Sequence, residues 1–202
     1  MPSVCEVHLV RPEEVPVVTA SLVRAFWDDP MLTYMFPNSR TRRRAMSRFF
    51  SIQLRESPKR SGLAYTTEGC HSTALWIPPR TGPPTVRDAL SQIPTLLTLG
   101  RRAGATLRLV RLVEARHPKL PHYYLGGLGT DPQWQGRGLG SAVIKPVLAI
   151  CDRDALPAYL ESSKESNLGF YRRHGFEVTD EVSVPDGSVR LWLMWREPLG
   201  SS

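Results

Sequence analysis

Apolar residues recur at helical spacing in two stretches near the start of the chain. The first stretch, residues 12–29, has acids in its first turn and ends at Asp29-Pro30, which predicts a helix that stops there. The second runs from about Ser39 to Glu56. The apolar faces are formed by Val15, Val18, Leu22 and Phe26 in the first helix and by Met46, Phe49, Phe50 and Leu54 in the second.

Other segments alternate apolar and polar residues or form short apolar runs, as strands do. "VCEVHLVRP" predicts a short strand, and "GLAYTTEGCHSTALWIPP" predicts a hairpin that turns at Glu68-Gly69. The last two strands are expected in "FEVTDEVSV" and "VRLWLMWRE", joined by a turn at residues 185–187. "LWLMW" is apolar on both faces, which is compatible with partial cover by a second copy in a homodimer.

The third quarter of the chain predicts a strand–helix–strand–helix order. "HYYLGGLGTDP" and "PAYLESS" are strands, "GSAVIKPVLAICDRD" is a helix despite Pro146, and "SNLGFYRRH" is a short helix ended by Gly175. Residues 85–115 have helical spacing broken at Pro94 and Gly100, so at least two helical pieces are expected there. Hairpins mixed with crossover helices indicate an α+β (α/β mixed) domain around a mixed sheet.

Composition narrows the class of protein. With 202 residues, of which 41% are hydrophobic, a single domain over 1–202 is expected. The net charge of +7 attracts polyanions, but the arginine-rich stretches have few interleaved aromatics, so nucleic acid is not expected as a partner. Three cysteines without a CxxC motif suggest neither disulfides nor a metal site. No apolar run reaches the roughly 18 residues of a membrane span, and no signal layout is present, so a cytoplasmic protein without membrane contact is expected.

The stretch "WQGRGLGS", residues 134–141, has glycine at every second position from Gly136 to Gly140. It lies between a predicted strand and a predicted helix, where backbone N–H groups and the helix dipole favour an anion. The dinucleotide fingerprint fails in both registers, because its third glycine is replaced by Ser141 or Val143, and a P-loop lacks its lysine. The remaining pattern is Gln135-x-x-Gly138-x-Gly140.

That pattern resembles the coenzyme A pyrophosphate loop of the GNAT superfamily of N-acetyltransferases, and "PAYLESSKESNLGFYRRHGFEV" resembles the strand and helix that follow it there. The resemblance runs from about His122 to Pro198 and more weakly through "AFWDDP" and "ALWIPP"; the nearest group is puromycin N-acetyltransferase and its actinobacterial relatives. It implies a GNAT-like central mixed, mostly antiparallel sheet flanked by helices, with acetyl-CoA as acyl donor. Residues 1–120 would then supply the acceptor side, and residues 121–202 the acetyl-CoA site and the C-terminal strands.

The resemblance also assigns donor-binding roles. Residues 135–141 would wrap the pyrophosphate, Leu128 and Thr130 would meet the pantetheine arm, and Asn167 would contact the cofactor. Each of these roles has an alternative. The loop can be an ordinary tight turn, the Arg137 side chain can point to solvent, and Asn167 can be a plain N-cap. The expected donor-binding residues are Leu128, Thr130, Gln135, Gly136, Arg137, Gly138, Leu139, Gly140, Ser141 and Asn167.

Two residues are expected to carry the chemistry. Tyr171 matches the tyrosine that protonates the departing thiolate, although a buried aromatic in a short helix is the alternative. Glu161 is the candidate general base, with a structural carboxylate as the equal alternative and with His122 and Tyr124 as rivals.

The acceptor side is expected in "FWDDPMLTYMFP". Phe26, Asp29 and Tyr34 would offer aromatic walls and a carboxylate to the amine of a small molecule, although a helix end with buried aromatics explains any one of them. A protein or peptide N-terminus is the rival acceptor. A catalytically idle GNAT-like protein that binds coenzyme A or associates with nucleic acid is the rival of another class.

Overall fold

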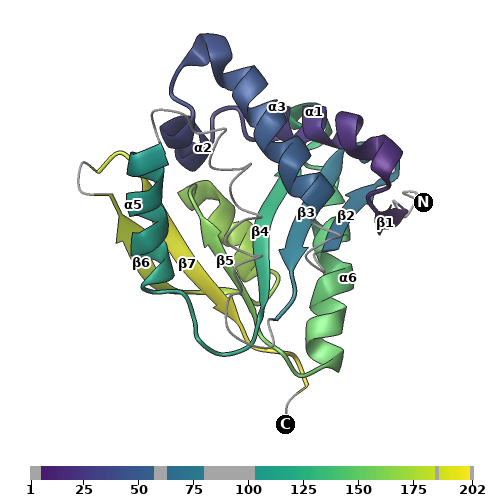
Figure 1. The fold of residues 1–202 in the computed structure, drawn as a ribbon. Helices are drawn as coiled ribbons and strands as arrows, with labels where there is room; N and C mark the ends of the chain where they lie inside the picture. The colour runs from purple at the N-terminus through teal and green to yellow at the C-terminus, as the bar shows by residue number, and fades with distance from the viewer. Residues whose placement is uncertain (1–5, 57–62, 80–102, 185–186, 201–202) are drawn as a thin grey trace.

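The computed structural model describes residues 6–56, 63–79, 103–184 and 187–200. Within them the chain forms one seven-stranded sheet in the order β1-β2-β3-β4-β5-β7-β6 (Figure 1). Neighbouring strands are antiparallel except β4 and β5, which are parallel. The α+β class and the mixed, mostly antiparallel sheet predicted from the sequence are therefore confirmed. The strands are β1 (Val7–Leu9), β2 (Leu63–Thr67), β3 (Ser72–Ile77), β4 (Tyr123–Thr130), β5 (Ala158–Ser162), β6 (Glu177–Ser183) and β7 (Arg190–Arg196).

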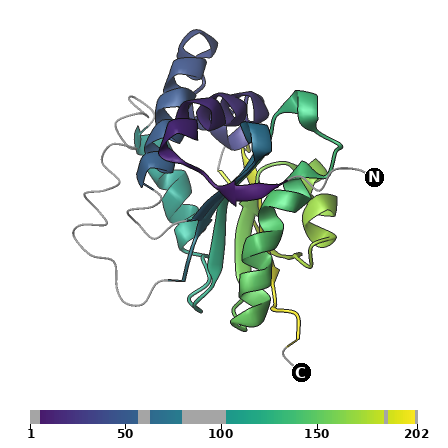
Figure 2. The same cartoon turned by 90° about the vertical axis from the view of Figure 1, so that its right-hand side faces the viewer.

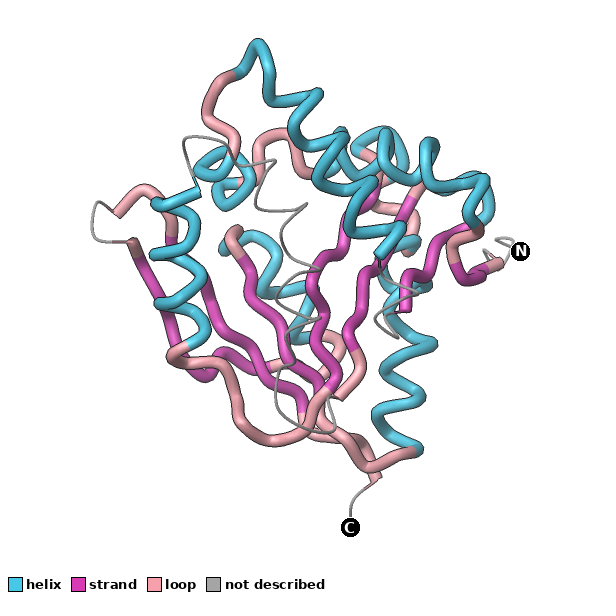
Figure 3. The backbone as a smooth tube through the Cα atoms, in the orientation of Figure 1, coloured by secondary structure: helices cyan, strands magenta, loops and turns pink. Residues whose placement is uncertain are grey.

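Helices cover both faces of this sheet (Figure 3). The helices α6 and α7 pack on one face, and α1, α3 and α5 pack on the other. Figure 2, turned by 90°, shows α5 and α6 on opposite sides. The helices are α1 (Val15–Ala25), α2 (Pro30–Met35), α3 (Ser39–Glu56), α5 (Ala103–Glu114), α6 (Leu139–Arg153) and α7 (Leu168–Arg172).

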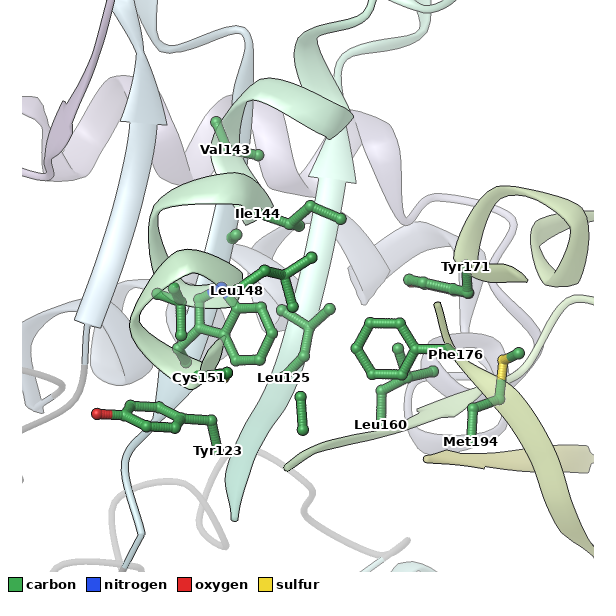
Figure 4. Packing of buried hydrophobic residues seen from close by; sticks show 14 of the residues in the cluster. Tyr123, Leu125, Val143, Ile144, Leu148, Cys151, Leu160, Tyr171, Phe176 and Met194 are labelled. Carbon is green, nitrogen blue, oxygen red and sulfur yellow. The ribbon is translucent and has the colours of Figure 1, made fainter. Parts of the chain in front are cut away.

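The core between the sheet and α6 is built from hydrophobic and aromatic residues (Figure 4). This cluster includes Val143 and Ile144 of α6, Leu125 of β4 and Leu160 of β5, and Phe176 lies beside Leu160. Burial of these side chains removes apolar surface from water and sets the position of the α6 N-terminus against the sheet. This packing also explains how α6 tolerates Pro146 inside the helix, because the tertiary contacts outweigh the lost backbone bond.

Alternate residues of β7 face opposite sides of the sheet. Leu191 and Leu193 are buried on the α5 side, and Trp192 and Met194 on the α6 side. The run that is apolar on both faces is thus covered within the same chain, and this pattern needs no second copy to explain it.

One prediction about the first helices was wrong. The helix expected over residues 12–29 is α1, which already ends at Ala25, and Asp29-Pro30 starts a further helix, α2, instead of only stopping the first. The Asp29 side chain accepts a hydrogen bond from Leu32 N, and Pro30 occupies the first helical position, where its missing N–H costs nothing.

Several predictions fall partly or wholly outside the described residues. These are the helical pieces before Ala103, the residues Pro185 and Asp186 of the last turn, and Cys5. Cys70 and Cys151 are described, and both are free and buried. Among the described helices, none is long and apolar enough to cross a membrane.

The parallel strands β4 and β5 pair over only part of their length. They are paired only over Tyr123–Leu125 and Ala158–Leu160; beyond these residues β4 pairs only with β3, and β5 only with β7. The register of β4 also shifts at Gly126, as in a β-bulge. The two strands therefore separate toward their C-terminal ends, which leaves one edge of β4 without a strand partner.

Gly129 explains why β4 is rich in glycine near this split. A Cβ there would lie 2.7 Å from Cε2 of Phe26 and 2.9 Å from Cδ2 of Leu22, so α1 approaches β4 too closely for any side chain. The glycine brings Phe26 of the α1–α2 corner next to the end of β4.

Candidate active site

A cavity of about 450 Å³ lies where β4 ends and α6 begins. The cavity is bounded by the α1–α2 corner, the end of β4, the loop to α6, and the segment from β5 to α7. It is lined by Ala25, Phe26, Asp29, Leu128, Gly129, Thr130, Trp134, Gln135, Gly136, Gly138, Leu139, Gly140, Ser141, Lys164, Asn167, Phe170, Tyr171 and Arg173.

The three alternating glycines lie in different surroundings. Gly136 and Gly138 have φ angles of 74° and 79°, in the left-handed region that favours glycine, and no atom lies within 4 Å of a Cβ built on either. Gly140 lies inside α6, and a Cβ on it would be 3.5 Å from Phe170 and from Oγ1 of Thr130. The first two glycines shape an open loop, whereas at Gly140 the protein itself would accept a Cβ at an ordinary contact distance.

The N-terminus of α6 offers free backbone donors to this cavity. The first i to i−4 hydrogen bond of the helix runs from Ala142 N to Gly138 O, at 3.0 Å, and no side chain caps this end. The amides of Leu139, Gly140 and Ser141 therefore have no carbonyl partner in the helix, and all three residues line the cavity. Free amides and the positive end of a 15-residue helix favour an anion such as a phosphate.

Side-chain contacts fix the loop that precedes α6. Nε2 of Gln135 donates to Thr130 O at 3.2 Å, which ties the loop back to the end of β4. Asp131, buried at the end of β4, accepts from Arg24 of α1 at 2.7 Å. Burial alone would raise the pKa of Asp131, but this hydrogen bond, with one from Gln133 N, holds it below its usual range.

Arg137 is not among the residues that line the cavity, but it stacks on Trp134, which does line it. Its guanidinium lies 4.6 Å from the ring centroid of Trp134, and His71 stacks on the same ring with centroids 3.7 Å apart. The Trp134 ring is thus the fixed centre of this part of the loop.

Tyr171 of α7 lies in the cavity wall and is only 7% exposed. Burial, followed by the negative field of Asp29, raises the pKa of its phenol well above the ordinary value. No hydrogen bond of its hydroxyl to another described residue is present. The phenol is therefore protonated at neutral pH and is available to a ligand. Asn167, also expected as a donor contact, lines the cavity one turn earlier.

The expected acceptor residues separate into two places. Phe26 and Asp29 line the cavity, whereas Tyr34 of α2 packs against the cluster around Leu109 and Tyr159 on the α5 side. Asp29 is 6% exposed, and its carboxylate is occupied by Leu32 N at 3.0 Å and by Oγ of Ser163. Asp29 therefore has a structural role, as the N-cap of α2 and as the partner of Ser163, which was the alternative to binding the amine.

Glu161, the candidate base, does not line the cavity. It lies on β5 next to the split, and its carboxylate accepts from the Tyr124 hydroxyl at 2.6 Å and lies 3.7 Å from Nδ1 of His117. His117 and His122 contact each other through their Nε2 atoms at 3.1 Å, and burial lowers the pKa of His122. The structure thus joins Glu161 with both of its rivals, His122 and Tyr124, in one polar cluster on the α5 side of the sheet.

Sequence reasoning missed several residues of these sites. Lys164 and Arg173 are the cationic side chains of the described cavity lining, and Phe170 and Trp134 are its further aromatic walls. The doubled arginine in "FYRRH" was a signal for Arg173, but a single lysine in a loop gave none. His117, the link between Glu161 and His122, follows α5 in a segment without a motif.

Comparison with known proteins agrees with this geometry. The model of the acetyltransferase (GNAT) family matches residues 86–176, which include β4, the glycine loop, α6 and Tyr171. An uncharacterized N-acetyltransferase of Schizosaccharomyces pombe is 27% identical over 203 residues, covering 94% of this chain and 82% of the relative.

Solved structures share the fold over nearly the whole chain. A crystal structure described as histone acetyltransferase HPA2 and related acetyltransferase, from Corynebacterium glutamicum, is 20% identical with a TM-score of 0.72 and covers 98% of both chains. Arylalkylamine N-acetyltransferase 2 from Aedes aegypti is 12% identical with a TM-score of 0.64, covering 95% of this chain and 98% of its own. The central sheet with its split parallel pair is therefore the GNAT fold.

Proposed function

Because the acetyltransferase (GNAT) family model matches residues 86–176 and the fold is that of GNAT proteins, we propose that the chain is an acetyltransferase that transfers the acetyl group of acetyl-CoA to the amine of a small molecule. The binding of acetyl-CoA as donor is supported above all by the free amides at the start of α6. These amides face a cavity beside the unpaired edge of β4. A cytoplasmic location, expected from the sequence, fits such a donor.

The residues of the cavity suit acetyl-CoA. The amides of residues 139–141 would hold its pyrophosphate, and the open space around Gly136 and Gly138 leaves room for the phosphate oxygens. The free edge of β4 at Leu128 would pair with the pantetheine arm as an added strand does. Donor phosphates and thioester would then lie at opposite ends of one continuous cavity.

The reaction needs a nucleophile, a base and an acid. The amine nitrogen attacks the thioester carbonyl carbon, and the carbon–sulfur bond breaks with its electron pair on sulfur. Tyr171 gives its phenolic proton to the thiolate. Because the pKa of the phenol is raised, the phenol is still protonated at neutral pH when the thiolate forms. The proton of the amine passes to Glu161, directly or through water, from the other side of the split.

Two arguments favour a small acceptor. The resemblance of "GLGSAV" and "NLGFYRRHGF" to the puromycin N-acetyltransferase group supports a small primary amine. The groups that the structure describes near the split are aromatic rings and a carboxylate, which suit an organic cation: Phe26, Tyr124, Tyr159 and Glu161. The similar folds were solved for proteins described by both histone and arylalkylamine acceptors, so fold likeness does not choose between the classes.

Turnover with a panel of acceptors tests the proposal. Coenzyme A release is measured with acetyl-CoA and puromycin, aminoglycosides, polyamines or short peptides as acceptors. We expect kcat/KM to be highest for one of the small amines. Turnover confined to the peptides would replace the small-molecule acceptor by a polypeptide, whereas binding of coenzyme A without any turnover would point to a non-catalytic protein.

A further inference from the structure

Two polar contacts that involve the cavity-lining residues Asp29 and Lys164 join segments about 135 residues apart in sequence. Oγ of Ser163 donates to Oδ2 of Asp29 at 2.5 Å, and Nζ of Lys164 donates to Oδ1 of Asp28 at 2.7 Å. Asp28 and Asp29 form the α1–α2 corner, and Ser163 and Lys164 follow β5. The corner on the acceptor side is thereby joined to the segment that leads from β5 to α7, the helix of Tyr171.

The two contacts differ in how easily they break. Asp29 is buried and also caps α2, so its contact is part of the fold. The side chain of Asp28 is 78% exposed and that of Lys164 is 29% exposed, and an ion pair in such surroundings is worth only about 0.2–1 kcal/mol. The Lys164 contact is therefore the one that a stronger anion displaces.

Lys164 is placed to exchange partners without moving its backbone. Its carbonyl accepts from Oγ of Ser162 at 3.0 Å and from Asn167 N at 3.1 Å, which pins the main chain. Its side chain lines the same cavity as the free amides of α6. The hydrogen bond from Lys164 also holds the pKa of Asp28 below its usual range, so Asp28 keeps its charge at neutral pH.

Resting on the proposed function, we propose that Lys164 is a donor-binding residue whose ammonium leaves Asp28 for a phosphate group of coenzyme A. A phosphate group of the donor presents a higher charge density than the solvated carboxylate of Asp28, and it is held in place by the α6 amides. Asp28 then competes with the donor for one cation, so it weakens donor binding, although no donor atom touches it. When the donor enters, the exchange also separates Asp28 of the α1–α2 corner from the segment between β5 and α7.

A double-mutant cycle tests this exchange. Dissociation constants for coenzyme A are measured by calorimetry at fixed ionic strength for the wild type, Asp28→Asn, Lys164→Met and the double variant. We expect Lys164→Met to weaken binding, and Asp28→Asn to tighten it about twofold to fivefold, the range set by the strength of an exposed ion pair. In the Lys164→Met background, Asp28→Asn is expected to have no effect.

Two controls separate this result from general electrostatics. Glu13→Gln removes the same charge beyond the other end of α1, where Glu13 is exposed and makes no hydrogen bond or ion pair with a described residue, and it should leave the affinity unchanged. Pantetheine, which lacks the phosphates, should bind equally to the wild type and to Asp28→Asn.

The outcomes distinguish this inference from the one on which it rests. Coenzyme A binding that is unaffected by Asp28→Asn, or tightened equally with and without Lys164, would overturn the exchange and leave the proposed function intact. Failure of the wild type itself to bind coenzyme A would overturn both.

Discussion

Tyr171 and Glu161 lie on opposite faces of one sheet, on either side of the point where β4 and β5 stop pairing. Tyr171 belongs to the α6 side and packs near Leu160, whereas the next residue of β5, Glu161, turns to the α5 side and meets Tyr124. Strand alternation makes this arrangement unavoidable once Leu160 is in the core. An acid and a base thus approach the split from two sides, with the donor cavity on the side of the acid.

Tyr171→Phe is expected to lower kcat by about 10²–10⁴, the usual worth of a positioned acid, with the dissociation constant for coenzyme A nearly unchanged. The ring is buried in the wall and Phe preserves its packing. Because burial raises the pKa of Tyr171 above about 10, its acid form persists through alkaline pH, so any loss of kcat/KM below pH 10 must come from another group. Steady-state rates from pH 6 to 10 check both points, and a variant with wild-type kcat would remove Tyr171 from the chemistry.

Glu161→Gln is expected to reduce kcat/KM by about 10²–10⁴ if the carboxylate takes the proton of the amine. Tyr124→Phe removes only the hydrogen bond that orients this carboxylate, and its effect should stay within about tenfold. Rates for both variants with the best acceptor provide the comparison. Equal, small losses would assign Glu161 the structural role instead.

Gly138→Ala is expected to fold and to lose coenzyme A. At a φ of 79° the alanine costs about 1–2 kcal/mol, and nothing in the protein lies within 4 Å of the new Cβ. The methyl group or a relaxed loop disturbs the amides that hold the pyrophosphate, so binding should weaken about 10-fold to 100-fold for one charge-assisted hydrogen bond lost.

Gly187→Ala is the matched control for that variant. Gly187 has a φ of 69°, with open space around a Cβ, and lies in the turn before β7 away from the cavity. It should show the same loss of stability in urea unfolding and unchanged coenzyme A binding by calorimetry. Similar affinities for the two variants would contradict an anion site in the glycine loop.

Asp152→Asn tests the ion pair that fastens the end of α6 to β7. Nη2 of Arg196 donates to Oδ2 of Asp152 at 2.8 Å, Nη1 lies 2.8 Å from Oδ1 without hydrogen-bond geometry, and Nε donates to His174 O. The Arg196 side chain is 3% exposed, so loss of the carboxylate should destabilise the fold by about 1–3 kcal/mol at pH 7.

The same pair has a defined pH dependence. The hydrogen bond from Arg196 lowers the pKa of Asp152 below its unfolded value of about 3.9, so the stabilisation is present above that pH and is lost as pH falls through the lower folded value. Urea unfolding of wild type and Asp152→Asn should differ at pH 7, and the difference should shrink as the pH falls below about 3.9. A difference that stays constant over this range would locate the effect in packing rather than in charge.

The sequence predicted the elements whose burial pattern is regular. The strands of the hairpin, β4 to β7, and the helices α3 and α6 were found because each buries one face or is apolar throughout. The helix α2 was missed because it has only six residues, too few to display a period, and because a proline that begins a helix looks the same as one that ends the previous helix.

The residues of the candidate site also differ in whether the sequence alone reveals them. Residues 135–141 and Tyr171 come together in the cavity because they belong to two adjacent motifs, which the spacing along the chain reveals. Lys164 and the corner at Asp28 lie 136 residues apart, and only the fold brings them within hydrogen-bond distance. Likewise, the sequence named Glu161, His122 and Tyr124 as rivals, whereas the fold joins them in one cluster through His117.

A crystal structure of the protein with coenzyme A tests the central claim most directly. We expect the pyrophosphate on the amides of Leu139, Gly140 and Ser141, and the sulfur beside the Tyr171 hydroxyl at the split between β4 and β5. Coenzyme A bound outside this cavity, or bound with its sulfur out of reach of Tyr171, would contradict the account.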